Sequence, residues 1–249
     1  FIMILILGSV YDDVLYFDTQ LKKRREETFK DHFKIIFGEL YGQNVVLAYN
    51  IFTNYMSSVV TTYLISKYDV IAVINVGSVR CLDDFKEGDI VYSETLFLGD
   101  ADVSVFEKVK KGQVPTYPQI FSGNSYFNNL INVYSSKFII SNVKKGNYIS
   151  LNREIVNIDQ LNQIKNENVI LGVSKDFIFD STFGGVALSS ATFDVPFVCL
   201  KVVISKIKDK VTTLERIRCI KEYANVGKII SAIILEIGRK DTLTVDTLN

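Results

Sequence analysis

The sequence predicts an α/β protein with a mostly parallel central sheet. Short apolar runs of strand type alternate with longer segments of helical periodicity along all 249 residues. The runs Ile2–Leu7 and Val70–Val76 are apolar at nearly every position and each ends at a glycine, as strands covered on both faces do. Because no internal repeat and no break in composition divides the chain, we expect a single domain over residues 1–249.

The expected strands are short, rich in β-branched and aromatic residues, and bounded by turn residues. They are Ile2–Leu7, Phe33–Phe37, Asn44–Ala48, Val70–Val76, Asp89–Leu96, Asn147–Leu151, Phe177–Phe179 and Val198–Ile204. The tripeptide Tyr41-Gly42-Gln43 indicates a hairpin between the second and third of them.

The expected helices show apolar residues three and four positions apart. They are Tyr11–Lys30, Asn54–Lys67, Asn124–Val133, Asp159–Lys165, Gly184–Phe193 and Thr212–Ile237. The last helix carries a stripe of isoleucines that predicts a core-facing surface. The mixed-sign run Lys22–Glu27 is expected on a solvated face of the first helix.

The charge balance excludes several function classes. The 28 Lys and Arg residues equal the 28 Asp and Glu residues in number, which argues against a general nucleic-acid binder and against a disordered acidic chain. A single histidine, His32, argues against a His-based zinc site or a Ser-His-Asp triad, and we expect it on the surface. The loops lack GxGxxG, GxxxxGK[ST] and GxSxG signatures.

The cysteine content and the hydropathy indicate the cellular compartment of the protein. Three widely spaced cysteines, Cys81, Cys199 and Cys219, favour a reducing environment, and no apolar run reaches the ~18–20 residues of a membrane span. We therefore expect a cytoplasmic protein. A secreted or surface form stays open because the chain begins with Phe1.

Two charged clusters offer alternatives to an enzyme site. The acids Asp83-Asp84 and Asp100-Ala101-Asp102 are of the type that binds a hard cation, although loop or helix-cap acids are the default interpretation. Basic residues of two segments could together bind a polyanion such as a glycosaminoglycan, which is the function of some surface adhesins. They are Lys108, Lys110, Lys111, Lys144 and Lys145.

The loops at the carboxyl ends of the strands are where a ligand is expected in such a sheet. Three of them stand out: Gly8–Asp13, Gly77–Asp84 and the end of the Val198–Ile204 strand near Ser205.

One sequence segment resembles a motif of a known protein family. The segment Asp100–Phe106, reading DADVSVF, and the following Gly112–Pro115, reading GQVP, resemble the "DADVTAF…GQxP" segment of the methylthioadenosine/S-adenosylhomocysteine nucleosidases. These enzymes belong to the purine nucleoside phosphorylase/uridine phosphorylase superfamily. Further segments match the family in the same order along the chain: Ile6–Val14, Val73–Ser78, Lys86–Val91, Gly184–Phe193 and Val195–Val198.

The resemblance implies a three-layer αβα sandwich with a mixed, partly closed central sheet, and a homodimer. It also implies hydrolysis of the N-glycosidic bond of an adenine nucleoside, in nucleoside catabolism and methionine salvage, without a cofactor. This reaction requires a proton or strong hydrogen bond at the leaving adenine, an activated water, and groups that hold the ribose and balance the developing positive charge.

Carried over by position, the family pattern assigns roles to several residues. Asp13 takes the place of the water-activating Glu, and Ser78 is expected to bind substrate. Val103, Phe106 and Pro115 match positions that line the neighbouring subunit's pocket, although they are also expected simply to pack the dimer interface.

The other two acids of the family pattern are replaced. Thr182 stands at the ribose-binding Glu and Ser205 at the base-binding Asp. We therefore expect a divergent nucleosidase with weak or no activity. The alternatives are a catalytically inactive homologue that binds a nucleoside or acts as an adhesin, a storage or structural relative, and a phosphorylase with Arg80 at its phosphate site.

Overall fold

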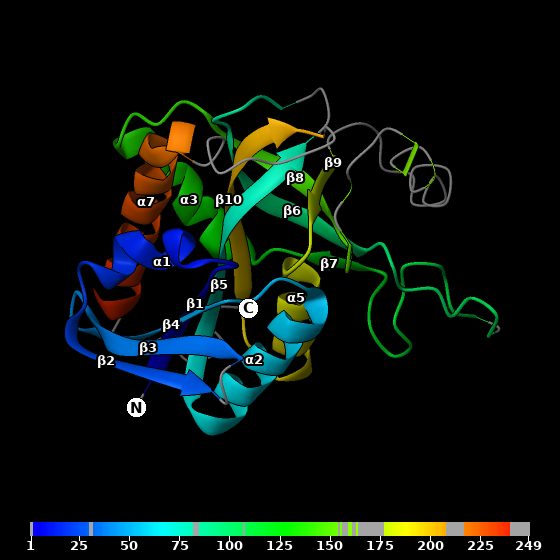
Figure 1. Ribbon diagram of the computed structural model, residues 1–249, viewed down its shortest axis with the longest axis horizontal. Coiled ribbons are helices and arrows are strands. Elements are labelled where there is room, and N and C mark those ends of the chain that lie inside the picture. The colour runs from blue at the N-terminus through cyan, green and yellow to red at the C-terminus, as the bar shows by residue number, and fades with distance from the viewer. Residues whose placement is uncertain are drawn as a thin grey trace.

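The computed structural model describes residues 2–29, 32–81, 85–106, 108–153, 155, 159–160, 163, 177–207 and 217–239 (Figure 1). The strands are β1 (Ile2–Leu7), β2 (Lys22–Phe29), β3 (Phe33–Leu40), β4 (Gln43–Tyr49), β5 (Asp69–Cys81), β6 (Ile90–Leu98), β7 (Ile120–Ser122), β8 (Val143–Ser150), β9 (Phe177–Asp180) and β10 (Phe197–Lys206). The helices are α1 (Tyr11–Asp18), α2 (Asn54–Lys67), α3 (Ser125–Lys137), α5 (Phe183–Thr192) and α7 (Ile220–Arg239).

The strands of the described chain form one sheet that is partly closed. Strands β5, β10, β6, β8 and β9 pair in a ring, because β5 bonds both β10 and β9. From β5 the sheet extends outward through β1, β4, β3 and β2. Strand β1 pairs in parallel with β4 and with β5. Strand β10 pairs antiparallel with β6, and β5 pairs antiparallel with β9. The sheet is therefore mixed, and the expectation of a mostly parallel sheet from strand–helix alternation is wrong.

Helices cover both faces of the sheet. Helices α1, α3 and α7 lie on one face and α2 with α5 on the other (Figure 1). Successive side chains of β1 point to opposite faces, so that Ile4 and Ile6 join one core cluster while Leu5 and Leu7 join the other. This is why β1 is apolar at nearly every position, and it confirms the three-layer fold.

Helix α7 presents the predicted stripe to the core. Its isoleucines at positions 229, 230, 233, 234 and 237 are all buried in the cluster shared with α1 and α3. Removal of these side chains from water provides the stability of the helix, at roughly 1.5–3 kcal/mol for each large aliphatic side chain.

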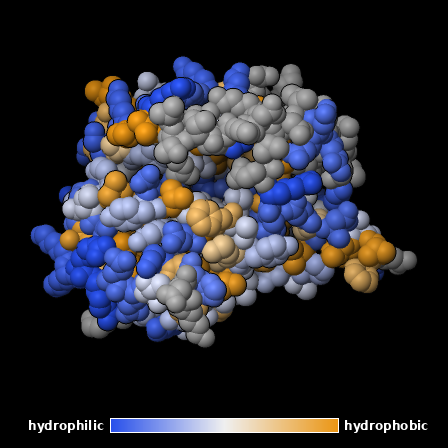
Figure 2. All heavy atoms as spheres, viewed as in Figure 1, coloured by the Kyte–Doolittle hydropathy of each residue, from blue (hydrophilic) through white to orange (hydrophobic). Residues whose placement is uncertain are grey.

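The first predicted helix is wrong beyond Asp18. The charged run belongs to β2, which pairs antiparallel with β3 and lies at the open edge of the sheet. Figure 2 shows a strongly hydrophilic surface at this side of the molecule. Exposed charges on an edge strand oppose pairing with a second chain. The run lacks an apolar stripe, so its conformation is decided by hydrogen bonds to β3 and not by its own periodicity.

The remaining expectations divide into three groups. Most of the other expected elements are confirmed within a few residues: strands β3, β4, β8, β9 and β10 and helices α2, α3 and α5. Strand β5 continues beyond Gly77 to Cys81. His32 is exposed, and the three cysteines are buried free thiols. The acids Asp83-Asp84 and most of Asp159–Lys165 lie outside the described residues. Within the described chain, no helix has the length and hydropathy needed to cross a bilayer.

Helix α5 packs closely on α2 through Gly185, which provides a test of the fold. A β-carbon at Gly185 would lie 2.1 Å from the Asn54 carbonyl oxygen and 2.2 Å from the Ser57 hydroxyl oxygen. We expect Gly185→Ala to lower the free energy of unfolding by about 1–3 kcal/mol, because the two helices must separate.

Thermal and urea unfolding measure this change. The control is Val133→Ala, at a position of α3 that is half exposed and is expected to change the unfolding free energy by less than about 0.5 kcal/mol. Equal stability of Gly185→Ala and the wild type would contradict the close packing of α2 and α5.

Candidate functional site

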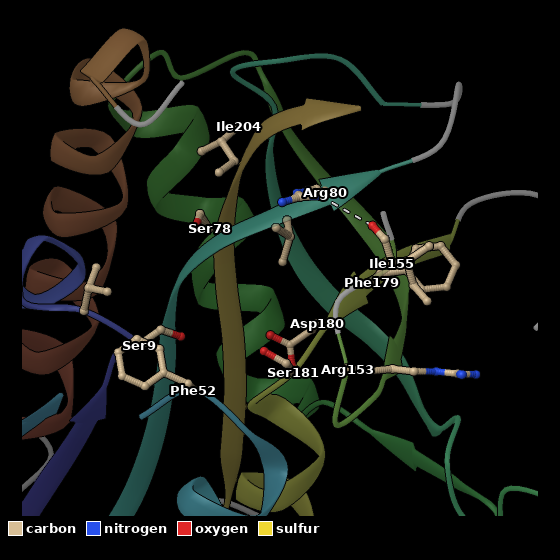
Figure 3. Close-up of a pocket in the computed structure, with 12 residues that line it drawn as sticks. Ser9, Phe52, Ser78, Arg80, Arg153, Ile155, Phe179, Asp180, Ser181 and Ile204 are labelled. Carbon is tan, nitrogen blue, oxygen red and sulfur yellow. Dashed lines mark hydrogen bonds between the residues drawn. The ribbon is translucent and has the colours of Figure 1, made fainter. Parts of the chain in front are cut away.

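A cavity of about 430 Å³ opens where the loop after β1 meets the ends of β5, β9 and β10 (Figure 3). Its lining residues are Ser9, Val10, Phe52, Ser78, Val79, Arg80, Arg153, Ile155, Phe179, Asp180, Ser181 and Ile204. The three loops chosen from the sequence as ligand loops therefore all contribute to one cavity. The volume lies within the range of small-molecule sites.

The two ends of the cavity differ in chemistry. At one end Arg80 lies against Ile155 and close to Phe179 and Ile204, so a cation sits beside apolar side chains. Toward the other end are hydroxyl groups of Ser9 and Ser181 and the carboxylate of Asp180 (Figure 3). The cavity thus combines a surface for a flat apolar ring with groups that hydrogen-bond a polar ligand.

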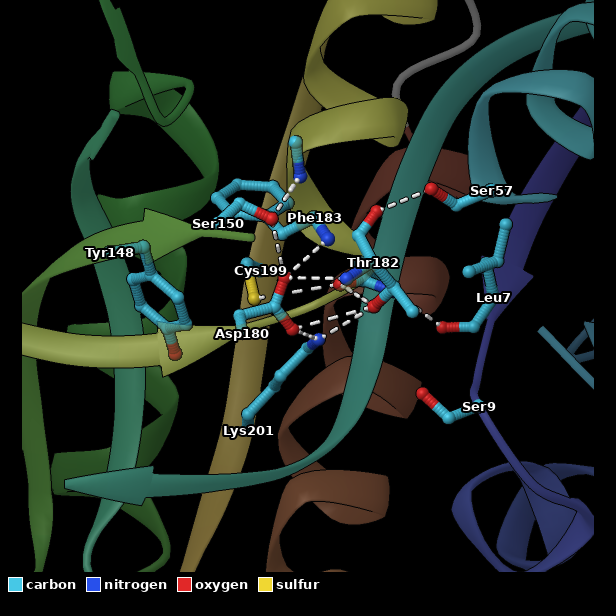
Figure 4. Close-up of polar contacts among 12 residues, drawn as sticks. Leu7, Ser9, Ser57, Tyr148, Ser150, Asp180, Thr182, Phe183, Cys199 and Lys201 are labelled. Carbon is cyan, nitrogen blue, oxygen red and sulfur yellow. Dashed lines mark hydrogen bonds and ion pairs between the residues drawn. The ribbon is translucent and has the colours of Figure 1, made fainter. Parts of the chain in front are cut away.

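A buried ion pair lies at the hydroxyl end (Figure 4). The Lys201 ammonium of β10 bonds the Asp180 carboxylate at the end of β9, and the two side chains are 1% and 3% exposed. Lys201 also donates a hydrogen bond of 3.0 Å to the Thr182 hydroxyl. A buried charge is tolerated where it has a partner of opposite sign and further hydrogen bonds, and both groups of this pair have them.

The Asp180 carboxylate also organises the start of α5. Its Oδ1 atom accepts hydrogen bonds from the backbone N–H groups of Thr182 and Phe183 and from the Ser150 hydroxyl. An anion at a helix N-terminus satisfies N–H groups that have no partner inside the helix. Both oxygens of the Asp180 carboxylate therefore accept hydrogen bonds from groups that stabilise the fold.

These contacts decide the ionisation of the pair. Burial alone would raise the pKa of Asp180, but the Lys201 ammonium and the N–H groups of Phe183 and Thr182 hold that pKa below its usual value. Burial alone would lower the pKa of Lys201, but the Asp180 carboxylate raises it above its usual value. Both groups are thus charged near neutral pH.

Thr182 lies inside this network and does not line the cavity. Its hydroxyl lies 3.4 Å from the Asn75 side-chain oxygen, and its carbonyl accepts a hydrogen bond of 2.6 Å from the Ser57 hydroxyl. The residue is almost fully buried. Thr182 therefore links β9 with β5 and α2 and is not positioned to face a ligand in the cavity.

Asp13 is buried beside the cavity. One of its oxygens accepts hydrogen bonds from the backbone N–H groups of Ser9 and Val10, at 2.9 and 3.0 Å. A β-carbon at Gly77 would lie 3.1 Å from the same oxygen, so the loop after β1 approaches β5 through a residue without a side chain. Asp13 fixes the shape of the loop that carries Ser9 and Val10 into the cavity.

A bulge in β10 decides which residue faces the cavity near Arg80. Val203 pairs with Val79 and Ser205 pairs with Arg80, so Ile204 is an extra residue between two neighbouring pairs. Ile204 lines the cavity, whereas the Ser205 hydroxyl is buried and has no hydrogen-bond partner among the described residues. Ser78, which the family pattern places in the substrate site, lines the cavity, whereas Thr182 and Ser205 do not.

The predicted dimer residues lie away from the cavity of their own chain. Val103, Phe106 and Pro115 belong to the segment between β6 and β7, which projects from the molecule (Figure 1). Phe106 is 64% exposed and Val105 is 86% exposed. A hydrophobic patch at the tip of this segment is visible in Figure 2.

Ion pairs compensate part of the basic cluster, and Asp83-Asp84 of the acidic cluster lie outside the described residues. Lys144 pairs with Asp89 at 2.7 Å and Lys145 with Glu94 at 2.9 Å, so this part of the basic patch is compensated. The described residues contain no group of three or more His, Cys, Asp or Glu side chains that could hold a metal ion.

Sequence reasoning missed Asp180, although a signal was present. Lys201 stands in the middle of an apolar strand, between Leu200 and Val202. A buried lysine in such a strand calls for an acid nearby, and Asp180 lies three residues before the start of a helix whose first turn contains two glycines.

The layers, the partly closed mixed sheet and the cavity at the strand ends define a nucleoside phosphorylase-like α/β protein. A family model described as the phosphorylase superfamily matches residues 3–234, and the chain belongs to this superfamily.

Relatives similar to this chain in sequence include nucleosidases. The 5'-methylthioadenosine/S-adenosylhomocysteine nucleosidase of Staphylococcus haemolyticus is 26% identical over 202 residues, which are 81% of this chain and 85% of the relative. The enzyme of Staphylococcus aureus strain Newman is 26% identical over 203 residues, with the same coverage of 81% and 85%.

Solved structures show the same fold. The nucleosidase of Neisseria meningitidis in complex with methylthio-immucillin-A has a TM-score of 0.82 at 21% identity, over 94% of this chain and 99% of the other. A putative nucleosidase of Borrelia burgdorferi bound to adenine has a TM-score of 0.76 at 22% identity, over 95% and 99% of the two chains.

The buried pair generates a prediction about stability. We expect Lys201→Met to lower the free energy of unfolding by about 3–5 kcal/mol, because the Asp180 carboxylate remains buried without its partner. The double variant Lys201→Met/Asp180→Asn removes both charges and should recover part of the loss. Urea unfolding measures both, with Lys23→Met in the exposed Lys23–Glu39 pair as the control, for which a much smaller change is expected.

The pair also predicts a pH dependence. Since the pKa of Asp180 is lowered by folding, its stabilisation is present above the unfolded value near 3.8 and is lost as pH falls through the lower folded value. Since the pKa of Lys201 is raised, its stabilisation is complete below the unfolded value near 10.5 and is lost as pH rises through the higher folded value.

The difference in melting temperature between the wild type and Lys201→Met/Asp180→Asn should therefore be constant from about pH 5 to pH 9 and change only at the extremes. A difference that varies steadily across neutral pH would contradict an ionised buried pair.

Proposed function

We propose that the cavity binds a purine nucleoside and that the chain is an N-glycosidase of much lower activity than its nucleosidase relatives. Membership of the phosphorylase superfamily and similarity to 5'-methylthioadenosine/S-adenosylhomocysteine nucleosidases support the substrate class. The cavity supports it too, since Phe179 and Ile155 offer surface for a base and Ser9 and Ser181 offer hydroxyls for a ribose.

One observation supports the proposal of low activity. Asp180, the carboxylate that lines the cavity within the described chain, accepts hydrogen bonds from Lys201 and from two backbone N–H groups. Hydrolysis of an N-glycosidic bond requires a proton donor for the leaving base and a base for the attacking water. A carboxylate with a lowered pKa is a poor proton donor, and its lone pairs already accept hydrogen bonds. Ile204, at the Arg80 end, has no proton to give.

Each missing acid or base reduces the rate by a factor of roughly 10²–10⁴. In this proposal Asp13 remains as the group that activates water, since its carboxylate lies at the loop of Ser9 and Val10 beside the cavity. Residual catalysis then depends on Asp13, with Ser78 as a substrate-binding hydroxyl.

An assay of adenine release tests the proposal. We expect turnover of 5'-methylthioadenosine to be at least about 100-fold slower than for the Staphylococcus haemolyticus relative measured in parallel, because one acid catalyst is missing. Asp13→Asn should remove the residual turnover with little change in melting temperature, because the amide oxygen can still accept a hydrogen bond from the loop. Turnover equal to that of the relative would contradict the proposal, as would the absence of any thermal shift with nucleosides.

We also propose that the active form is a homodimer. Helix α2 exposes Tyr55 and Val59, which are 72% and 58% exposed and lie one turn apart, and the β6–β7 segment exposes Val105 and Phe106. Exposed apolar surface of this kind marks protein interfaces. In the dimer Val103, Phe106 and Pro115 would approach the partner's cavity.

Light scattering with size-exclusion chromatography tests the dimer. We expect Val59→Glu to shift the protein to a monomer, because a charge in an apolar interface loses its hydration. Val133→Glu, at a similarly exposed position of α3, should leave the mass unchanged. A wild-type protein that is monomeric at micromolar concentration would contradict this assignment.

A further inference from the structure

We propose that Arg80 selects the base of the nucleoside, and that the cavity prefers a 6-oxopurine, hypoxanthine or guanine, over adenine. This inference rests on the proposed nucleoside site and goes beyond it, because the named relatives act on adenine nucleosides. Its basis is the position of a guanidinium at the end of the cavity that offers surface for a ring.

The backbone of Arg80 is fixed from both sides. It pairs with Ser205 of β10 on one edge of β5 and with Phe179 of β9 on the other. The side chain is half buried, lines the cavity, and donates a hydrogen bond of 3.4 Å from Nη1 to the Ile155 carbonyl (Figure 3). The strand pairing therefore places the guanidinium at the same end as Ile155, Phe179 and Ile204.

The hydrogen-bonding capacity of a guanidinium decides which base edge it fits. It has five N–H donors, no acceptor, and a permanent charge. Guanine and hypoxanthine present two acceptors, O6 and N7, on one edge, and arginine binds such an edge with two parallel hydrogen bonds. Adenine presents a donor at N6 beside the acceptor N7, a pattern that Asn or Gln matches and Arg does not.

No described side chain at this end offers the paired acceptor and donor that match the N6 and N7 edge of adenine. No Asn or Gln lines the cavity in the described chain, and the guanidinium of Arg80 lies beside the Ile155 carbonyl. Asp180 accepts from Lys201 and from the start of α5. Ile204 stands beside Arg80 and offers no polar atom. An adenine in this orientation would direct its amino group at a cation.

Calorimetric titration of the full chain with inosine and adenosine tests the inference, because these nucleosides differ only in the base edge. We expect inosine to bind on the order of tenfold to a hundredfold more tightly than adenosine, as one bidentate contact discriminates between bases in other complexes. Arg80→Gln should reverse the preference, since a glutamine matches the N6 and N7 edge of adenine. Arg25→Gln, on the exposed edge strand β2, should keep the wild-type preference.

The outcomes separate this inference from the proposed function. Tighter binding of adenosine to the wild type, or an unchanged preference in Arg80→Gln, overturns the role of Arg80 and leaves the nucleoside site intact. Binding of neither nucleoside overturns both. Titration with inorganic phosphate is the third arm: phosphate binding that Arg80→Gln abolishes, with the base preference unchanged, assigns Arg80 to an anion and overturns base selection.

Discussion

The contact between Lys201 and Asp180 is the constraint on which the centre of the molecule depends. An unpaired charge at this depth would cost several kcal/mol, so β10 and β9 must be positioned together. The same carboxylate starts α5, and Thr182 connects it to Asn75 of β5, whose amide donates to the Leu7 carbonyl of β1. One ion pair thus couples the closed ring of strands to its open extension and to the second helical layer.

That coupling has a chemical consequence. A carboxylate that stabilises the fold by accepting hydrogen bonds on both oxygens has a low affinity for a proton and little freedom to move. Within the described residues, the carboxylate that lines the cavity is therefore a poor proton donor. Under the proposed function, recognition depends on groups that do not need to change protonation, such as the serine hydroxyls and the guanidinium of Arg80.

The sequence predicted those parts of the fold in which local pattern and tertiary packing agree. Ile2–Leu7 is apolar throughout because both faces of β1 are covered, and the isoleucine stripe of α7 follows from one buried face. It did not predict β2, whose partner is another strand, or the direction of β6 relative to β10, which no local pattern encodes. The loops of the cavity were foreseen, but the ion pair was not, because Asp180 and Lys201 meet only through the closure of the ring.

The bulge at Ile204 decides which side chain at the end of β10 faces the cavity. Side chains along a strand alternate between its two faces, so one inserted residue changes the face of every residue that follows. Counting forward from Val195-Pro196-Phe197 assigns Ser205 to the base, but the extra residue in β10 turns Ile204 toward the cavity and leaves the Ser205 hydroxyl in the interior. The polarity of this end of the cavity is consequently set from β5, by Arg80, and not from β10.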